Sequence, residues 1–208
     1  VAKLTASDAA SGDLFGISVA IDGDTVVIGA PPEDRSLRGA AYVFRTTDGG
    51  ATYGQLAKLT ASDAADNWFG VPVAIDCDTI VIGASSAGTG GAVYVFRTTD
   101  GGATYVEVAK LTASDAAYGD YFGGSLAIDG ATIVVGAHKA SGPGAVYVFR
   151  TTDGGATYGQ VAKLTASDAA AGDSFGVSVA IDGDTIVVGA RFAGTGGAVY
   201  VFRTSDGG

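Results

Sequence analysis

The stretch FGISVAIDGDTVVIGA, from Phe15 to Ala30, contains two apolar runs joined by a short turn rich in Gly and Asp. Each run is short, is rich in Val and Ile, and alternates in part with polar residues, which is the pattern of a β-strand. Near copies of the stretch begin at Phe69, Phe122 and Phe175. No segment has the length or the 3.6-residue period of an amphipathic helix. The stretch therefore predicts an all-β fold built from a repeated strand hairpin.

Two further apolar runs lie between these copies. One has the form AVYVFR and the other the form VAKLTA, and the segment KLTASDAA recurs at Lys3, Lys58, Lys110 and Lys163. Each repeat thus holds four short strands, in the order FGxSVAID, TVVIGA, AVYVFR and VAKLTA. Four antiparallel strands repeated at a period of about 50 residues are typical of β-propeller blades. We expect a single β-propeller domain over residues 1–208, with four blades encoded.

The chain opens on a VAKLTA strand and closes on an AVYVFR strand, so the last blade lacks a fourth strand of its own. We expect the N-terminal strand, Val1–Ala6, to pair with Ala198–Arg203 and so to seal the ring, which would leave no exposed strand edge. Two other arrangements stay open. Two copies could close together as eight blades, or the chain could be a segment of a longer repeat array.

The motif TTDGGATY connects the third and fourth strands of a blade. It runs from Thr46 to Tyr53, recurs from Thr98 and Thr151, and begins again at Thr204. In such a loop the Asp carboxylate accepts backbone N–H bonds, Gly allows positive φ, and the aromatic ring covers the turn. The motif resembles the Asp-box, which has the pattern Ser/Thr-x-Asp-x-Gly-x-Thr-aromatic and lies between the same two strands. We predict a structural role for it.

Composition narrows the classes of function. The net charge of −10 argues against nucleic acid or an anionic membrane surface as a partner. No apolar run is long enough for a transmembrane helix, and no signal peptide is visible. Cys77 is the only cysteine and occupies the turn position that Gly23 holds in the first repeat, so we interpret it as a turn residue. Because the chain has one His and two Glu, little is available for acid–base catalysis, and we expect no enzyme.

The stretch FGISVAIDGDTVVIGAP and its three copies resemble FG-GAP repeats, the blades of integrin α-subunit propellers and of many secreted proteins. The resemblance covers essentially the whole chain. It implies an extracellular, secreted or cell-surface propeller engaged in adhesion or ligand binding. One departure concerns calcium, because the first two strands are joined here by only DGDT (Asp22–Thr25), too short to wrap an ion with six to eight oxygens. Such propellers also commonly have seven blades rather than four.

A ligand is expected on the face that carries the loops from fourth to first strand and from second to third strand. The loops of the opposite face are nearly identical among the repeats, whereas these differ. Exposed aromatic rings with Arg suit a binding surface, and aromatic rings with Asp and Asn suit sugars. The alternative is that unconstrained loops have diverged without a function. The candidate ligand-binding residues are Trp68, Tyr118, Tyr121, His138, Lys139, Arg191, Phe192, Arg35 and Arg38.

The fourth-to-first loops also carry pairs of polar side chains that are close in sequence. Each pair could share a Ca²⁺ with backbone carbonyls, or it could cap its turn by accepting N–H bonds, which is the interpretation we favour. Calcium is the one cofactor that these residue types suggest. The pairs are Asp8 with Asp13, Asp63 with Asn67, Asp115 with Asp120, and Asp168 with Asp173.

An Arg ends every AVYVFR strand, and we expect each of these side chains to pair with an Asp of the adjacent loop. The four are Arg45, Arg97, Arg150 and Arg203.

Three functions follow from these patterns. The preferred one is a non-catalytic extracellular module that binds a glycan or a protein through the variable loop face. The second is a structural unit that builds a matrix or filament by end-to-end association, which the near-identical repeats suggest. The third is a glycosidase-like enzyme. A sialidase, for example, would need a cluster of three Arg facing one pocket together with a Tyr/Glu pair, and nothing places Arg35, Arg38 and Arg191 together.

Overall fold

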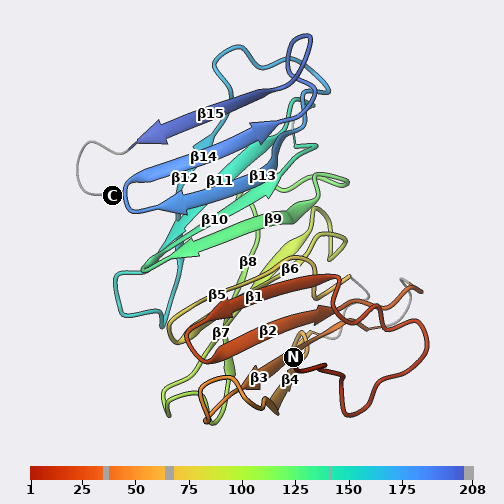
Figure 1. The fold of residues 1–208 in the computed structure, drawn as a ribbon. Helices are drawn as coiled ribbons and strands as arrows, with labels where there is room; N and C mark the ends of the chain where they lie inside the picture. The colour runs from red at the N-terminus through yellow and green to blue at the C-terminus, as the bar shows by residue number, and fades with distance from the viewer. Residues whose placement is uncertain (35–37, 64–67, 141, 204–208) are drawn as a thin grey trace.

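The structure is a computed structural model, and it describes residues 1–34, 38–63, 68–140 and 142–203. These residues form fifteen β-strands and no helix (Figure 1). Within this described part, therefore, no helix could cross a membrane. The predicted all-β class is confirmed.

The strands form four antiparallel sheets, which we call blades 1 to 4. Blade 1 contains β1 (Ser18–Asp22), β2 (Thr25–Ala30), β3 (Ala40–Arg45) and β4 (Gly54–Leu59). Blade 2 contains β5 (Val73–Asp76), β6 (Thr79–Ala84), β7 (Ala92–Arg97) and β8 (Val106–Leu111). Blade 3 contains β9 (Phe122–Asp129), β10 (Thr132–Ala137), β11 (Ala145–Arg150) and β12 (Gly159–Leu164). Blade 4 contains β13 (Phe175–Asp182), β14 (Thr185–Ala190) and β15 (Ala198–Arg203).

The blades follow one another in space in the order of the sequence. The first strands of successive blades contact each other, β1 with β5, β5 with β9, and β9 with β13. Figure 1 shows the result as a stack that runs from blade 1 to blade 4. Each blade is an up-and-down meander, as the four-strand repeat predicts.

The hydrophobic core lies between neighbouring blades. Val27 and Val43 of blade 1 share one buried cluster with Ile80 of blade 2, and both later gaps contain an equivalent cluster. In blade 2 the ring of Phe69 stands edge-on to Tyr94, with centroids 5.4 Å apart. Every blade repeats this contact between the Phe of its Phe-Gly pair and the Tyr of its third strand, and edge-to-face rings attract beyond the area they bury.

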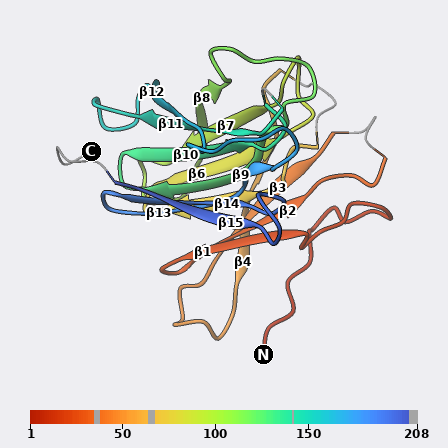
Figure 2. The ribbon, with the colours of Figure 1, turned by 90° about the horizontal axis from the view of Figure 1, so that it is seen from above.

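The predicted seal between the ends of the chain is not formed. Residues 1–6 form no strand, and β15 pairs only with β14, so blade 4 has three strands among the described residues. The physical reason is distance: the four blades fan out as an open arc, with β15 at one end and the N-terminal segment at the other (Figures 1 and 2). Residues 1–6 instead lie on blade 1, where Leu4 and Ala6 pack against Ile28 and Tyr42.

The TTDGGATY loops have the geometry that their residue types predict. Asp48 Oδ1 accepts hydrogen bonds from the Thr46 hydroxyl (2.8 Å) and the Thr52 backbone N–H (2.9 Å), while Oδ2 accepts the Thr52 hydroxyl (2.6 Å). Gly50, at φ 92°, donates its N–H to Thr46 Oγ1. The loops from Thr98 and Thr151 repeat this network. Each loop is therefore closed by one carboxylate.

These networks predict how stability depends on pH. Hydrogen bonds from Thr52 and Thr46 lower the pKa of Asp48 from 3.8 to about 2, and the pKa values of Asp100 and Asp153 are lowered by their own Thr partners. A carboxyl whose pKa is depressed by folding stabilises the fold above its unfolded value and loses that effect as pH falls through the folded value. We therefore expect the urea midpoint to fall between about pH 4 and pH 2. The variant with Asp48, Asp100 and Asp153 all changed to Asn should lose much of this slope, and an unchanged slope would contradict the assignment.

Among the described residues, Arg45, Arg97 and Arg150 at the ends of the third strands bind Thr hydroxyls and form no ion pair with Asp, contrary to expectation, while the loop after Arg203 lies outside the described residues. Arg45 donates from Nε to Thr25 Oγ1 (3.2 Å) and from Nη1 to the carbonyl of Gly101, in the TTDGGATY loop of the next blade. Arg97 makes the same two contacts, with Thr79 and Gly154. Each of these carbonyls belongs to a glycine with positive φ, and the Arg that binds it links two blades.

Candidate ligand-binding cleft

The residue before each Phe-Gly pair has a left-handed backbone conformation. Its φ is 45° at Leu14, 54° at Trp68, 59° at Tyr121 and 57° at Ser174. A non-glycine residue in this region costs on the order of 1 kcal/mol or more, and such strain is concentrated at functional sites. Glycine would relieve it, yet every repeat carries a side chain here. In the two central repeats that side chain is a large aromatic ring.

Trp68 and Tyr121 line one cleft on the predicted binding face. Its volume is about 280 Å³, and His138 and Lys139, from the loop after β10, complete it. The cleft thus draws on the loops that enter blades 2 and 3, which the arc brings side by side. The full lining is Trp68, Val71, Ser85, Ser86, Tyr121, Gly124, His138 and Lys139.

The cleft combines aromatic faces with positive charge. Lys139 Nζ stands 4.5 Å from the centroid of the Tyr121 ring, and the imidazole of His138 lies 5.5 Å from the same ring. Burial, followed by the nearby charges of Lys139 and Arg191, lowers the pKa of His138 below its usual value. The imidazole is therefore neutral at physiological pH, so it can both donate and accept a hydrogen bond.

A smaller hollow adjoins the cleft. It has a volume of about 130 Å³ and shares Ser85, Ser86 and Tyr121 with the cleft, while Tyr118 forms its far wall. Tyr118 is 92% exposed, so its ring is available to a ligand without rearrangement. The two hollows share Tyr121 and together offer room for a chain of more than one small ring.

The other predicted residues lie around this site or away from it. Arg191 is close enough to His138 to affect its pKa, and its guanidinium stacks on Phe192 at 4.7 Å. Arg38 is exposed and lines neither the cleft nor the smaller hollow, and Arg35 lies outside the described residues. The sequence pattern did not single out Ser85 and Ser86. Their position in a variable second-to-third loop, SSAGTGG, was the available signal.

The carboxylates proposed for calcium have other partners. Asp8 accepts hydrogen bonds from the Tyr42 hydroxyl (2.9 Å) and from Lys58 Nζ (2.6 Å), and the Lys58 contact contributes most to lowering the pKa of Asp8. Asp13 instead accepts the N–H of Ala10 (2.7 Å). Asp120 and Asp173 cap their loops in the same way, Asp63 and Asp115 repeat the contacts of Asp8, and Asp168 accepts a Tyr hydroxyl. The bonds of Asp13, Asp120 and Asp173 agree with the capping interpretation, whereas the first Asp of each pair binds side chains instead. Calcium binding stays a prediction, and Asn67 lies outside the described residues.

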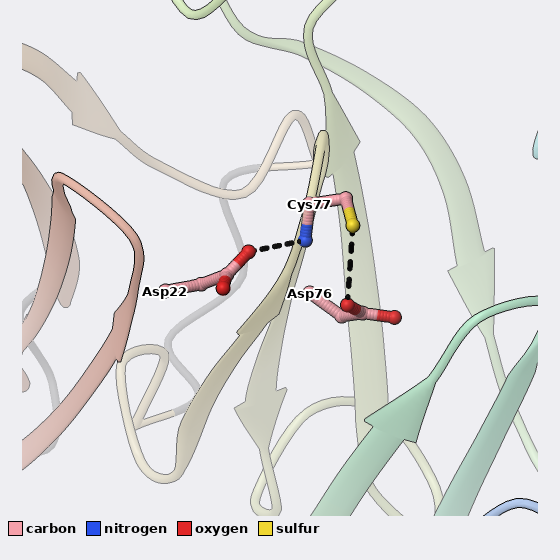
Figure 3. A group of neighbouring side chains, drawn as sticks. All are labelled: Asp22, Asp76 and Cys77. Atoms are coloured by element: carbon pink, nitrogen blue, oxygen red, sulfur yellow. Dashed lines mark hydrogen bonds between the residues drawn. The ribbon is translucent and has the colours of Figure 1, made fainter.

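Asp22, Asp76 and Cys77 form the one cluster of potential metal ligands found in the described residues (Figure 3). Asp22 accepts the backbone N–H of Cys77 (2.7 Å), and Asp76 in turn accepts the thiol (3.4 Å). The same bond recurs in the later blades, where Gly130 donates its N–H to Asp76 and Gly183 donates its N–H to Asp129. It therefore links the hairpin turns of successive blades. Cys77, at φ 50°, serves as a turn residue, and its Asp76 contact raises the pKa of the thiol.

A hollow of about 410 Å³ lies between blades 3 and 4, on the side of the TTDGGATY loops. Thr132 and Arg150 stand at its wall. Tyr105 interacts with the corresponding residues of blade 1, Thr25 and Arg45, and Tyr158 does so in blade 2. A Tyr ring thus stands at the equivalent place in the two preceding gaps between blades. We therefore interpret this hollow as part of the packing between blades and not as a ligand site.

The sequence matches a family model described as FG-GAP repeat, at residues 1–44, 53–96, 105–149 and 158–202. The four matches follow the four blades. Among curated protein sequences there is no match.

Several solved structures share the fold at low identity. The α-L-arabinanase of Penicillium chrysogenum complexed with arabinobiose has 13% identity and a TM-score of 0.56, over 88% of this chain and 60% of that one. The α-L-arabinofuranosidase Arb93A of Fusarium graminearum, with an iminosugar inhibitor, has 12% identity and a TM-score of 0.57, over 94% and 67%. Sqt1 of Saccharomyces cerevisiae has 11% identity and a TM-score of 0.51, over 89% and 47%. The chain thus spans 60% of the length of the arabinanase, and these similarities establish the fold alone.

Proposed function

Because the chain belongs to the FG-GAP repeat family, we propose that it is a non-catalytic binding module that holds a glycan in the cleft of Trp68 and Tyr121. The single observation that carries the proposal is this pair of aromatic side chains. Both are held at strained φ in one cleft, beside the neutral imidazole of His138. Aromatic faces stack on the C–H faces of sugars, and a neutral imidazole can exchange hydrogen bonds with hydroxyls.

The charges at the rim favour a glycan that carries an acidic group, such as a uronate or a sulfate ester. Lys139 lies over the Tyr121 ring, and Arg191 lies close to His138, in a chain whose net charge is −10. Two cations gathered at one cleft of an acidic protein make a local site for an anion. The adjoining hollow at Tyr118 would receive the next sugar along the chain.

Binding rather than hydrolysis is proposed because the described lining of the cleft contains no carboxyl group. Most glycosidases use a pair of them on either side of the scissile bond. The arabinanase and the arabinofuranosidase act on arabinose-containing glycans by their names, and they share only the fold with this chain. The proposal also includes a secreted or cell-surface location, which the resemblance to adhesion propellers implies.

The test is a panel of neutral, uronate-containing and sulfated oligosaccharides, followed by calorimetric titration of the strongest binder. We expect binding by acidic members, and we expect Trp68→Ala or Tyr121→Ala to weaken it by about tenfold or more. Lys139→Ala should weaken acidic glycans and leave neutral ones unchanged. The matched control is Val106→Ala, an exposed apolar residue of β8 in the opposite part of the blade.

Three results would contradict the proposal. A panel that stays blank at millimolar concentrations would exclude the glycan, and binding to surface proteins instead would assign the face to a protein ligand. Release of reducing sugar from the bound oligosaccharide by the purified chain would show an enzyme.

A further inference from the structure

We propose that His138, positioned by Gly124, is a proton switch for the cleft: when the imidazole gains a proton at mildly acidic pH, the cleft binds an anionic ligand more tightly. This regulation concerns the cleft of Trp68 and Tyr121 and rests on the proposed function, because an acidic glycan is the anion that the cleft would hold. It adds to that function a dependence on pH, which binding by aromatic rings alone would not have.

The imidazole of His138 lies in the cleft, against its aromatic wall. The centroid of its ring is 5.5 Å from that of Tyr121, and the two rings are tilted by 35°. Trp68, Ser85 and Ser86 of blade 2 line the same cleft. A ligand in the cleft therefore meets a side chain whose charge can change near neutral pH.

Two cations act on the imidazole. Lys139 comes directly after it in the loop that follows β10, and Arg191 belongs to the loop that follows β14 of blade 4. Burial, followed by these two charges, lowers the pKa of His138. The described lining contains no carboxyl group, and the residues that blade 2 contributes to it are uncharged.

The carboxylates of the adjacent entry loops are engaged within those loops. Asp120, which precedes Tyr121, accepts the N–H of Ala117 (2.8 Å). Asp173, at the same place in blade 4, accepts the N–H of Ala170 (2.8 Å). A positive charge on the imidazole would therefore have no counter-ion in the described lining of the cleft, and a bound anion would supply one.

An anion and a proton thus favour each other at this site. Without a ligand, a third positive charge beside Lys139 and Arg191 is repelled, which keeps the imidazole neutral. A carboxylate or sulfate group in the cleft offsets this repulsion and can accept a hydrogen bond from the imidazolium. Because coupled binding equilibria are reciprocal, the factor by which a proton strengthens anion binding is also the factor by which the anion strengthens proton binding.

Gly124 leaves the room that the imidazole occupies. Its N–H donates to the carbonyl of Tyr121 (3.0 Å), as the N–H of Val177 does to Ser174 in blade 4 (3.1 Å), so the two turns have the same backbone bond. A Cβ added to Gly124 would lie 3.0 Å from the Tyr121 carbonyl oxygen and 3.3 Å from Nδ1 of His138. Because this turn carries a side chain in blade 4, we expect a side chain at Gly124 to displace the imidazole and not the backbone. The other repeats have a β-branched residue at this place, namely Ile17, Val71 and Val177.

The combination of this Gly with a His occurs in one repeat only. The residues equivalent to His138 are Pro31, Ser85 and Arg191. Arg191 is a permanent cation, whereas Pro31 and Ser85 carry no charge. Histidine is the residue type whose ordinary pKa allows a change of charge near neutral pH. The third repeat therefore contains both the switch and the space for it.

Proton NMR of the 208-residue chain tests the switch directly, because His138 is its only histidine. In chloride the imidazole Hε1 resonance should titrate with a midpoint below the ordinary pKa of 6.5. Replacement of chloride by inorganic sulfate at equal ionic strength should raise that midpoint, because sulfate supplies the missing counter-ion. A midpoint that is the same in both salts would overturn the proposal.

Calorimetric titration with tetragalacturonate tests the effect on a glycan. Its carboxylates remain ionised at about pH 7.5 and at about pH 5, and the affinity should be about tenfold higher at the lower pH, on the scale of one charge-assisted hydrogen bond. The fully methyl-esterified form has the same backbone without the charges, so its affinity should not change with pH.

The two titrations separate a failure of the switch from a failure of the proposed function. If tetragalacturonate binds equally at both pH values, the switch is wrong and the glycan proposal is unaffected. If neither oligosaccharide binds while sulfate still raises the NMR midpoint, the glycan proposal is wrong and the anion switch is supported.

Two substitutions of His138 test whether its charge is responsible. His138→Gln can exchange hydrogen bonds but cannot gain a proton, so the affinity for tetragalacturonate should no longer change between the two pH values. His138→Arg introduces the residue of the fourth repeat and a permanent charge. Its affinity should also be independent of pH and should exceed that of His138→Gln at both values. A pH dependence that survives in either variant would assign the effect to another group.

Gly124→Val tests the positioning role. The imidazole should leave the cleft, so the NMR midpoint should return toward 6.5 and no longer respond to sulfate, while the circular dichroism spectrum stays unchanged. The matched control is Gly159→Val, at an exposed position with no atom near the added Cβ, where the second repeat has Val106. This control should titrate like the original chain. If Gly124→Val also titrates like the original chain, Gly124 does not position the imidazole.

Discussion

Gly29→Ala is expected to lower the free energy of unfolding by about 3 kcal/mol, although it adds one methyl group to a strand residue of ordinary φ. The added Cβ would lie closer than 3.0 Å to the carbonyl oxygen of Gly70 in the next blade. That oxygen belongs to a backbone segment held in place, because the N–H of Gly70 donates to the carbonyl of Gly83 (3.1 Å). Blades 1 and 2 would therefore have to separate locally.

The measurement is chemical unfolding of the variant and of Gly159→Ala, whose added Cβ meets no atom within 4 Å. We expect the control to change the free energy of unfolding by less than about 0.5 kcal/mol. If the two variants are equally stable, the blades do not approach each other as closely as the structure shows.

Gly29 also shows what a sequence can predict in a repeat protein. The four TVVIGA-type strands and the FGxSVAID strands of blades 3 and 4 were predicted correctly, because short β-branched runs between Gly and Asp turns are determined locally, whereas β1 and β5 begin only at Ser18 and Val73. Gly29 and Gly189 occupy the same place in that motif, yet one faces a neighbouring backbone and the other an open hollow. Their difference depends on the position of a blade in the arc, and the repeated sequence does not record it. The predicted seal of residues 1–6 on β15 failed for the same reason.

The sequence predicted which face of the molecule carries the candidate cleft, but not the arrangement of the residues that line it. Variable loops indicated where a site could lie, and Trp68 and Tyr121 were named from their residue types. Which side chains meet depends on left-handed φ values at non-glycine residues, for which the sequence has no signal. Arg45 shows a prediction that failed. The sequence suggested an Asp partner for its charge, but in the structure its guanidinium donates to the backbone carbonyl of Gly101. Local chemistry was thus predictable, and contacts across the gap between blades were not.

Phe122→Ala is expected to lower the free energy of unfolding by about 3–5 kcal/mol, more than the glycine substitution at the same kind of interface. The side chain is fully buried, and its ring stands edge-on to Tyr147 and Phe149 at centroid distances of 5.6 and 5.8 Å. Its removal leaves a cavity where blade 3 meets blade 2 and ends both ring contacts. The backbone link from the Phe122 N–H to Gly90 (2.8 Å) is retained, so the effect reports the side chain.

Chemical unfolding measures the loss, with Phe192→Ala as the exposed aromatic control, for which we expect less than about 0.5 kcal/mol. Phe15→Ala provides the sharper comparison, because Phe15 holds the same place in blade 1 and makes the same edge-on contacts, yet it is only half-buried. Phe15→Ala should lower the free energy of unfolding clearly less than Phe122→Ala. Equal losses would mean that burial between blades does not set the contribution of these rings to stability.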